Sequence, residues 1–183
     1  MKEYFRQNKI LAKINKGDEA AFMEMYNYYA PKLFRHACFR LSSRELAEDI
    51  AQQVFYKTWQ YIINPKNKID NLNAFLYKTI NNLITDHYRL ATKETLPLDD
   101  VIEDHGNKIF NEPSYEVEID SDLEKIKVRE SIKLLKPEQQ ELIAWRYLDD
   151  LTTAEISKIS GKSSGAIYVG IHRALKELRK VIV

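Results

Sequence analysis

The stretch TTAEISKISGKSSGAIYVGIHRALKELR, residues 152–179, determines the fold that we predict for the last third of the chain. Thr152 and Glu155 have the spacing of a capping box, which satisfies backbone N–H groups where a helix begins. Gly161 marks the end of that short helix, because glycine adopts the left-handed backbone of a helix end without steric cost. Ser163 can cap a second, longer helix. A short helix, a glycine turn and a longer helix are typical of a helix-turn-helix.

The longer helix has an apolar face and a polar face. Ile167, Ile171, Leu175 and Leu178 are spaced three or four residues apart and predict one core stripe. Basic residues gather toward the end of the polar face, where they suit both the helix dipole and DNA phosphates. The spacing also fits an αα-hairpin with a solvated basic face, so both interpretations stay open at this point. The outward side chains are Lys162, Ser164, Tyr168, His172, Lys176 and Arg179.

The N-terminal half also has helical periodicity. Apolar residues recur at helical spacing over residues 21–29. Pro31 is expected to begin a new helix over residues 32–41, because proline disrupts the interior of a helix. Ser42 and Glu45 have the spacing of another capping box. We therefore predict a further helix that begins at this serine, with an apolar face toward the core and a face of acids and amides toward solvent.

Two more segments complete this half. Residues 64–71, NPKNKIDN, have the composition of a loop. A helix is predicted over residues 74–89, where apolar side chains again recur at helical spacing. Periodicity then fails from residue 91 to residue 122, and it resumes near Leu123, with Pro137 placed where a helix can begin.

Charge divides the chain into three blocks. Residues 1–90 carry 14 Lys and Arg against 9 Asp and Glu, a net charge of +5. Residues 91–124 carry 2 against 11, or −9, and residues 125–183 carry 12 against 7, or +5. Basic segments on both sides of an acidic one are compatible with nucleic-acid binding at both ends. A run of like charges that prolines interrupt is also typical of a solvated linker. The two interpretations are compatible.

The composition excludes several classes of protein. The 183 residues are 44% hydrophobic and 30% charged, which is ordinary for a folded soluble protein. No apolar stretch approaches the roughly 20 residues of a membrane span, and the first residues lack the apolar core of a signal peptide. Cys38 is the single cysteine, which fits a reducing cytoplasm, so we expect a cytoplasmic location.

No catalytic or metal-binding pattern is present. The four histidines are scattered and have no ligand spacing with Cys38. No Ser/His/Asp signature and no glycine-rich phosphate loop occurs. The paired acids at 99–100 and 149–150 are interpreted as linker and loop residues. We therefore expect a protein that is not an enzyme and needs no cofactor or metal.

Three segments, in this order, resemble the extracytoplasmic-function sigma factors of the sigma-70 family. Residues 47–55, AEDIAQQVF, followed by Trp59, resemble their polymerase-binding segment. Residues 74–89, AFLYKTINNLITDHYR, resemble the segment that melts and reads the −10 promoter element. Residues 151–175 resemble their −35 helix-turn-helix. The resemblance covers nearly the whole chain apart from the linker, and the order of three motifs makes it more specific than any one of them.

The resemblance implies an all-α fold of two small domains. Region 2 would occupy residues 1–90 and would bind core polymerase and open the −10 element. Region 4 would occupy residues 123–183 and would read the −35 element, and an acidic linker over 91–122 would join the two. The implied partners are promoter DNA and core RNA polymerase, through the clamp helices of its largest subunit and its flap region. An anti-sigma factor is a partner that the family allows, although no residue here indicates one.

The resemblance also implies a role for individual residues. The polymerase-binding set is Glu48, Asp49, Gln52 and Gln53. The −35 set is Lys162, Ser163, Ser164, Ala166, Tyr168, His172, Arg173, Lys176 and Arg179.

The −10 set combines cations that follow a backbone, rings that stack on bases and amides that bond base edges. Some of its members are expected to be structural, with Tyr77 partly buried and Asp86 paired with Arg89. The set is Lys66, Lys68, Asn71, Asn73, Tyr77, Lys78, Asn82, Asp86, His87, Tyr88 and Arg89.

The sequence departs from the family pattern at three of its positions. Gln53 stands where the family often has Glu, so one charge of the usual surface is missing. Tyr168 and Gly170 occupy positions that are often basic or polar, which leaves the −35 sequence undetermined. Gly170 can serve a close approach either to a neighbouring helix or to DNA, and the sequence does not distinguish the two.

Two other classes of protein share some of these features. A transcriptional regulator with the same helix-turn-helix and a dimerising or sensing N-terminal domain would bind duplex DNA alone, without any use for the polar face at Asp49 and Gln53. A helical adaptor that binds only protein would have no need of Lys162, Lys176 and Arg179.

Overall fold

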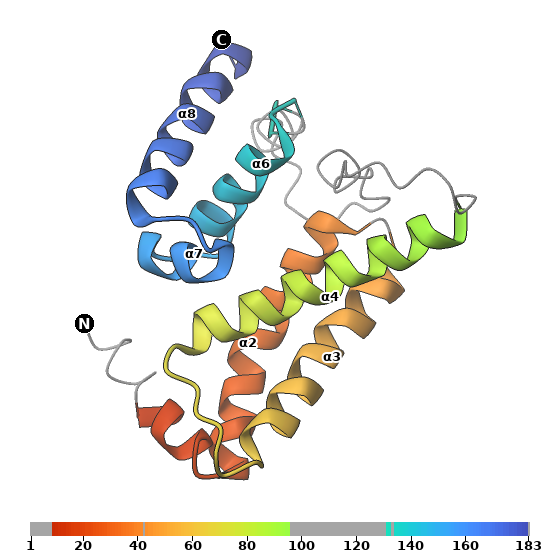
Figure 1. Ribbon diagram of the computed structural model, residues 1–183, viewed down its shortest axis with the longest axis vertical. Helices are drawn as coiled ribbons and strands as arrows, with labels where there is room; N and C mark the ends of the chain where they lie inside the picture. The colour runs from red at the N-terminus through yellow and green to blue at the C-terminus, as the bar shows by residue number, and fades with distance from the viewer. Residues whose placement is uncertain (1–8, 42, 96–130, 133, 183) are drawn as a thin grey trace.

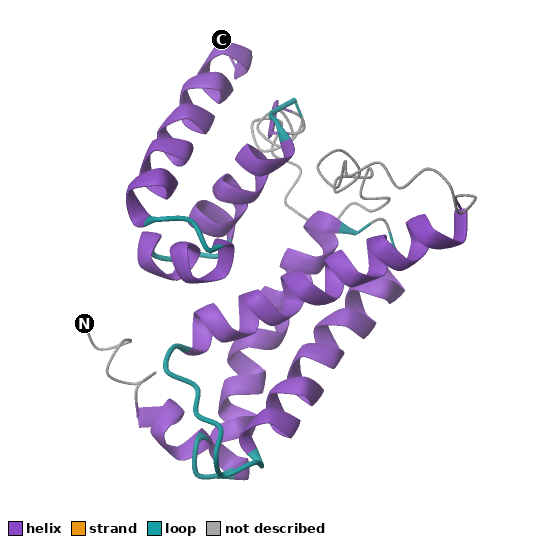
Figure 2. Ribbon diagram, in the orientation of Figure 1, coloured by secondary structure: helices purple, strands orange, loops and turns teal. Residues whose placement is uncertain are grey.

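The computed structural model describes residues 9–41, 43–95, 131–132 and 134–182, and all of their regular structure is helical (Figure 2). The all-α prediction is therefore confirmed for these residues. Most of the predicted acidic linker, from residue 96 onward, lies outside them. The helices are α2 (Glu19–Arg40), α3 (Arg44–Ile62), α4 (Leu72–Thr95), α6 (Pro137–Ile143), η1 (Ala144–Leu148, a π-helix), α7 (Thr153–Ser160) and α8 (Ser164–Ile182).

The three long helices α2, α3 and α4 pack side by side in the N-terminal half (Figure 1). Their shared core is apolar, and Leu33, Val54, Leu76 and Ile80 are fully buried in it. Burying such side chains stabilises a fold by about 1.5–3 kcal/mol each. One face of each helix is committed to this core, and the opposite face of α3 is left exposed.

Two helix starts differ from the sequence prediction. Pro31 lies inside α2 and does not begin a new helix. The helix continues through it because Tyr29 and Leu33, on either side, are buried in the core and hold both halves in line. The cap of α3 is Ser43, whose side chain accepts from the N–H of Leu46, so the predicted cap at Ser42 was wrong by one residue.

The helix-turn-helix is present as predicted. Thr152 accepts from the N–H of Glu155, and a carboxylate oxygen of Glu155 accepts from the N–H of Thr152 at 2.9 Å. Gly161 ends α7 with a left-handed φ of 72°. Ser163 accepts from the N–H of Ala166 and thereby caps α8. These local bonds fix where the two helices begin and end.

The C-terminal helices pack against the N-terminal three. Leu142, Trp145, Leu151, Ile156 and Ile167 belong to the same buried cluster as the core of α2, α3 and α4. Figure 1 shows α7 above the start of α4, and these two helices share an extensive contact. The described residues therefore form a closed arrangement, in which the two halves of the chain are in contact.

Gly170 serves the packing of one helix on another. A Cβ atom built at this position would lie 2.6 Å from Cδ1 of Leu142, a buried side chain of α6. The alternative that the sequence left open is thus decided in favour of a neighbouring helix. Gly165, in the same helix, has nothing within 4 Å of the equivalent point, so the requirement is specific to Gly170.

The two glycines of α8 should respond in opposite ways to alanine. Gly165→Ala should raise the free energy of unfolding by up to about 1 kcal/mol, because alanine is the better helix former. Gly170→Ala should lower it by about 1 kcal/mol, because displacing a packed Leu142 outweighs that gain. Urea unfolding followed by circular dichroism measures both. Equal stabilisation by the two variants would show that the Leu142 side chain moves aside without cost.

Candidate nucleic-acid interface

The polar face of α8 is exposed along its length. Tyr168 is 70% exposed in the middle of this face, while Ile167 beside it is fully buried. Two residues before the helix also have local roles: Ser163 caps it, and Lys162 pairs with Glu138 at 3.1 Å. All members of the predicted −35 set are exposed, namely Lys162, Ser163, Ser164, Ala166, Tyr168, His172, Arg173, Lys176 and Arg179.

The end of α8 mixes cations with one acid. Lys180 lies 2.8 Å from Glu177, and this hydrogen bond lowers the pKa of the Glu177 carboxyl. Lys176 and Arg179 are exposed on the same turn of the helix. Because Lys180 is already paired with Glu177, it can serve as a control for the contribution of Lys176 and Arg179 to binding.

The polar face of α3 is exposed along its length. Glu48, Asp49, Gln52 and Gln53 all lie on it, and Glu48 pairs with Arg44 at 2.9 Å. Sequence reasoning did not include Tyr56, one turn further on. Tyr56 is 62% exposed and accepts a hydrogen bond from the Gln60 amide at 2.7 Å, which extends the polar face by a flat ring.

The loop between α3 and α4 is held in place by paired hydrogen bonds. The Asn15 amide donates to the carbonyl of Ile69 at 3.0 Å and accepts from its N–H at 3.0 Å. The Asn67 amide donates to the carbonyl of Tyr61. Lys66 and Lys68 are exposed on this loop. Both lysines therefore lie on a loop that hydrogen bonds hold in place and that ends next to the first turn of α4.

From Lys78 onward, α4 places polar side chains toward solvent. Lys78, Asn82, Asp86 and Arg89 are exposed, and Asp86 pairs with Arg89 at 3.0 Å as the sequence predicted. His87 and Tyr88 are half-buried.

The Tyr88 hydroxyl donates to the carbonyl of Arg40, and burial raises the pKa of this hydroxyl. This tyrosine therefore has a structural contact as well as a partly exposed ring.

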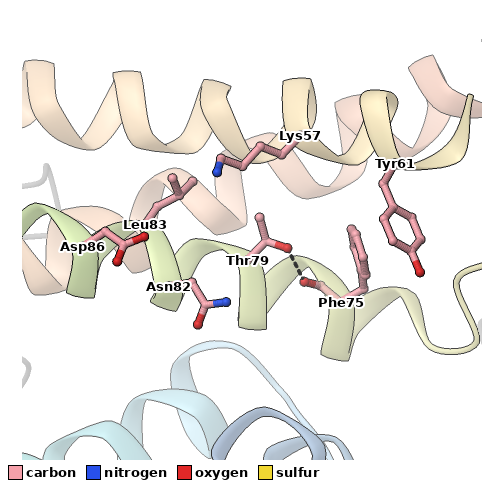
Figure 3. Close-up of a pocket in the computed structure, with 7 residues that line it drawn as sticks. All are labelled: Lys57, Tyr61, Phe75, Thr79, Asn82, Leu83 and Asp86. Carbon is pink, nitrogen blue, oxygen red and sulfur yellow. Dashed lines mark hydrogen bonds between the residues drawn. The ribbon is translucent and has the colours of Figure 1, made fainter. Parts of the chain in front are cut away.

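A cavity of about 240 Å³ opens between α3 and α4 (Figure 3). The rings of Tyr61 and Phe75 lie against each other at its wall, with centroids 4.9 Å apart. The Thr79 hydroxyl donates to the carbonyl of Phe75, so this residue presents its methyl group. The lining consists of Lys57, Tyr61, Phe75, Thr79, Asn82, Leu83 and Asp86.

The cavity brings together residues that the sequence treated separately. Asn82 and Asp86 were predicted to contact DNA, whereas Lys57 and Tyr61 come from α3, which was interpreted only as a polymerase-binding helix. Only the packing of α3 on α4 places them together, so the sequence carried no signal for this association. The result is a pocket with aromatic walls and with an amide, an ammonium group and a carboxylate at its rim.

Three members of the predicted −10 set face the C-terminal half of the chain. The Asn73 amide donates to a carboxylate oxygen of Glu155 at 2.7 Å, and the Asn71 amide lies 3.4 Å from the same oxygen. The Tyr77 side chain is fully buried, and its hydroxyl donates to Asp149 at 3.1 Å. The expectation that Tyr77 has a structural part is confirmed, because it belongs to the buried core and its ring also packs edge-on against His36 of α2.

Asp149 is bonded on both carboxylate oxygens. Nδ1–H of His36 donates to one oxygen at 2.8 Å, and neither side chain is exposed. The other oxygen accepts from Tyr77. Burial and, after it, the nearby Asp149 carboxylate raise the pKa of the Tyr77 hydroxyl, which therefore stays protonated as a donor.

Arg40 forms a second polar contact between the halves. Its guanidinium bonds Glu141 at 2.8 Å and the side-chain carbonyl of Asn81 at 2.7 Å. Burial lowers the pKa of Arg40, and the Glu141 carboxylate acts in the opposite direction. Arg35 adds a bond from its guanidinium to the carbonyl of Leu148. The contact between the halves is therefore polar as well as apolar.

A membrane-spanning helix and a metal-binding group are both absent among the described residues. None of their helices combines the length and apolarity of a membrane span. No group of three or more His, Cys, Asp and Glu side chains among them is arranged to hold a metal ion. Cys38 is buried, and burial raises the pKa of its thiol.

Comparison with known proteins assigns the family. Residues 25–94 match Sigma-70 region 2, and residues 125–178 match Sigma-70, region 4. The ECF RNA polymerase sigma factor BldN of Streptomyces coelicolor is 24% identical over 184 residues, which cover 97% of this chain and 66% of BldN. The ECF RNA polymerase sigma factor SigW of Bacillus subtilis is 27% identical over 182 residues, which cover 94% of each protein.

Solved structures have the same fold. CnrH, in complex with the cytosolic domain of CnrY, superposes with a TM-score of 0.66 at 17% identity and covers 97% of both chains. RpoE of Bartonella quintana, in complex with the anti-sigma factor NepR, gives a TM-score of 0.63 at 20% identity, with 88% of this chain and 96% of RpoE covered.

These matches define a transcription initiation factor with DNA-binding regions. The chain belongs to the sigma-70 family and is an extracytoplasmic-function sigma factor. The resemblance stated from the sequence is thereby confirmed. In this family's terms, α2, α3 and α4 belong to the match with region 2, and α6, η1, α7 and α8 belong to the match with region 4.

Proposed function

We propose that this sigma factor binds core RNA polymerase through α3, reads and melts the −10 element with the α3–α4 loop and α4, and reads the −35 duplex with α8. The observation that carries the proposal is the division of α8 into two faces. Its core stripe is packed on α6, while the whole predicted −35 set is exposed. An α-helix with one free polar face is the element that the major groove admits.

The face of α3 supports the assignment to polymerase. Asp49, Gln52 and Gln53 are exposed and offer acceptors and donors to a partner helix. The clamp helices of the largest subunit are the proposed partner, and the flap region would hold region 4. An anti-sigma factor is also proposed as a partner, with support from the fold that this chain shares with RpoE of the NepR complex.

The cavity between α3 and α4 fits the handling of a melted strand. Its volume is several times the roughly 30 Å³ that one water molecule occupies. Rings such as Tyr61 and Phe75 can stack on an unpaired base, which contributes about 1–3 kcal/mol. Asn82 and Asp86 at the rim can bond the edge of that base. Capture of unstacked bases offsets the cost of melting, about 1.4 kcal/mol for each base-pair step.

Transcription in vitro with core polymerase on a library of promoter fragments tests the proposal as a whole. Adding the chain should produce initiation from a subset of fragments. The variant Asp49→Ala/Gln52→Ala/Gln53→Ala should reduce this initiation at least tenfold, because each change removes hydrogen-bonding groups from the α3 face. Asn27→Ala, at an exposed position of α2, is the matched control and should behave like the wild type.

Two other results would redirect the assignment. If the chain binds duplex DNA alone and does not redirect polymerase, the function is that of a transcriptional regulator. If initiation depends on the chain but the triple variant is fully active, the polymerase contact lies on a surface other than α3.

The cations of α8 should contact phosphates of the −35 duplex. For the complex with polymerase, the slope of log K against log salt concentration should become shallower by about 0.9 for each of Lys176→Ala and Arg179→Ala. Lys180→Ala should change the slope much less, because Glu177 already neutralises Lys180. Fluorescence anisotropy on a labelled promoter over a range of salt concentrations gives the slopes. Equal slopes for all three variants would contradict the contact.

The cavity should be needed for opening the −10 region. A fluorescent base analogue is placed at each position of the −10 element in turn, and its fluorescence reports opening of the duplex. Asn82→Ala should reduce this open-complex signal about tenfold, which corresponds to about 1.4 kcal/mol. Thr85→Ala, exposed on the same helix outside the cavity lining, should have no effect. A normal signal with Asn82→Ala at every analogue position would remove the cavity from the proposal.

A further inference from the structure

The first two turns of α8 carry neither charged nor amide side chains. Residues 163–171 have the sequence SSGAIYVGI, so the hydroxyls of serine and tyrosine are the only side-chain groups there that form hydrogen bonds. Lys162, just before the helix, is paired with Glu138. In a helix-turn-helix, the N-terminal residues of the second helix contact the edges of the bases. The part of α8 that would meet the bases therefore lacks the long polar side chains that discriminate between them.

Direct reading of a duplex uses either pairs of hydrogen bonds or apolar contact. Arginine or lysine bonds two acceptors of guanine, and asparagine or glutamine bonds two groups of adenine. A single hydroxyl, such as that of Ser164, bonds several bases and discriminates little between them. The hydroxyl of Ser163 is already used, because it accepts from the N–H of Ala166 as the helix cap. Hydrogen bonding at this end of α8 therefore provides little sequence specificity.

An apolar surface takes the place of these polar groups. Tyr168 is 70% exposed and Val169 is 45% exposed, and Ala166 is exposed beside them. A Cβ atom built at Gly165 would have nothing within 4 Å, so another molecule can approach the helix closely at this point. Residues three and four apart lie on one face of a helix, which places Gly165 next to both Tyr168 and Val169. Gly165, Ala166, Tyr168 and Val169 thus form one exposed surface, the apolar tip of α8.

The cations of α8 lie beyond the apolar tip. Arg173 is the first lysine or arginine of the helix, and it lies about 14 Å along the axis from Ser164. Lys176 and Arg179 follow at intervals of nearly one turn. The major groove is about 12 Å wide, so a helix whose tip touches base edges brings its later cations to the phosphates. Contact with phosphates and discrimination between bases are thus assigned to different parts of one helix.

We propose that α8 reads the −35 duplex through thymine methyl groups, with Ala166, Tyr168 and Val169 as the residues that determine specificity. The inference rests on the proposed −35 function and adds to it the chemical group that is read. Thymine carries a methyl group on its major-groove edge, and alanine and aromatic side chains make apolar contact with it. The −35 elements of this sigma factor should therefore present thymines to the apolar tip, and the acceptors of guanine should contribute little.

Removal of single methyl groups tests the inference with the full chain bound to core polymerase. In a promoter fragment from the transcription experiment, each thymine of the −35 element is replaced in turn by deoxyuridine, which lacks only the methyl group. At contacted positions the affinity, measured by fluorescence anisotropy, should fall about fourfold, the value of one buried methyl group. Replacing the same thymine by 5-methylcytosine should cost less affinity than replacing it by cytosine. Replacing guanines by 7-deazaguanine, which lacks the N7 acceptor, should have little effect.

Protein variants connect the lost methyl group to the apolar tip. With Tyr168→Ala or Val169→Ala, the effect of deoxyuridine should disappear at the positions that the missing side chain contacts. Both side chains are exposed, so neither change removes packing from the core. Arg179→Ala is the matched control. It should weaken binding to every fragment and leave the effect of deoxyuridine unchanged, because this side chain is assigned to a phosphate.

The outcomes separate failure of this inference from failure of the −35 function. If deoxyuridine changes nothing and 7-deazaguanine lowers the affinity, α8 reads guanine, and the inference is wrong although the −35 function is retained. If deoxyuridine lowers the affinity equally for the wild type and both alanine variants, the effect comes from the shape of the duplex, and the inference is again wrong. If no change of the upstream sequence alters the affinity, the −35 function itself is wrong.

Discussion

A carboxylate can lie inside a protein only where donors satisfy its oxygens, and Asp149 meets this condition with groups from two helices of the other region. His36 on α2 and Tyr77 on α4 must both face it, which sets where region 4 lies on region 2. The apolar contacts of Trp145, Leu151 and Ile156 then pack around this polar centre. The position of one acid thereby constrains α2, α4 and the turn between η1 and α7.

Close contacts between elements position the surfaces that we propose to meet other molecules. The close approach at Gly170 seats α8 on α6 and leaves its polar face outward. The paired bonds of Asn15 to Ile69 hold the α3–α4 loop against the turn that precedes α2. In both places a contact between segments that are distant in the sequence presents a surface of cations, rings and amides. Specific hydrogen bonds and close packing therefore prepare these surfaces before any ligand arrives.

The sequence predicted best what short-range chemistry determines. The capping box at Thr152, the left-handed Gly161 and the cap at Ser163 are bonds within a few residues, and the structure has all three. Pro31 was misassigned because burial of the flanking side chains overrides the tendency of proline to end a helix. The contact of Asn73 with Glu155 joins residues 82 positions apart, and neither residue carries a local signal for it.

The two carboxylate oxygens of Glu155 have different partners, and this difference determines how region 4 can move. The oxygen that caps α7 is bonded within the helix-turn-helix, and the oxygen that reaches Asn73 is bonded outside it. Loss of the outer bond leaves the inner one intact, so separation of the regions does not require α7 to fray. The helix-turn-helix would then move as a rigid body and would already be folded when it binds the duplex. Its binding free energy would not be reduced by a cost of ordering α7.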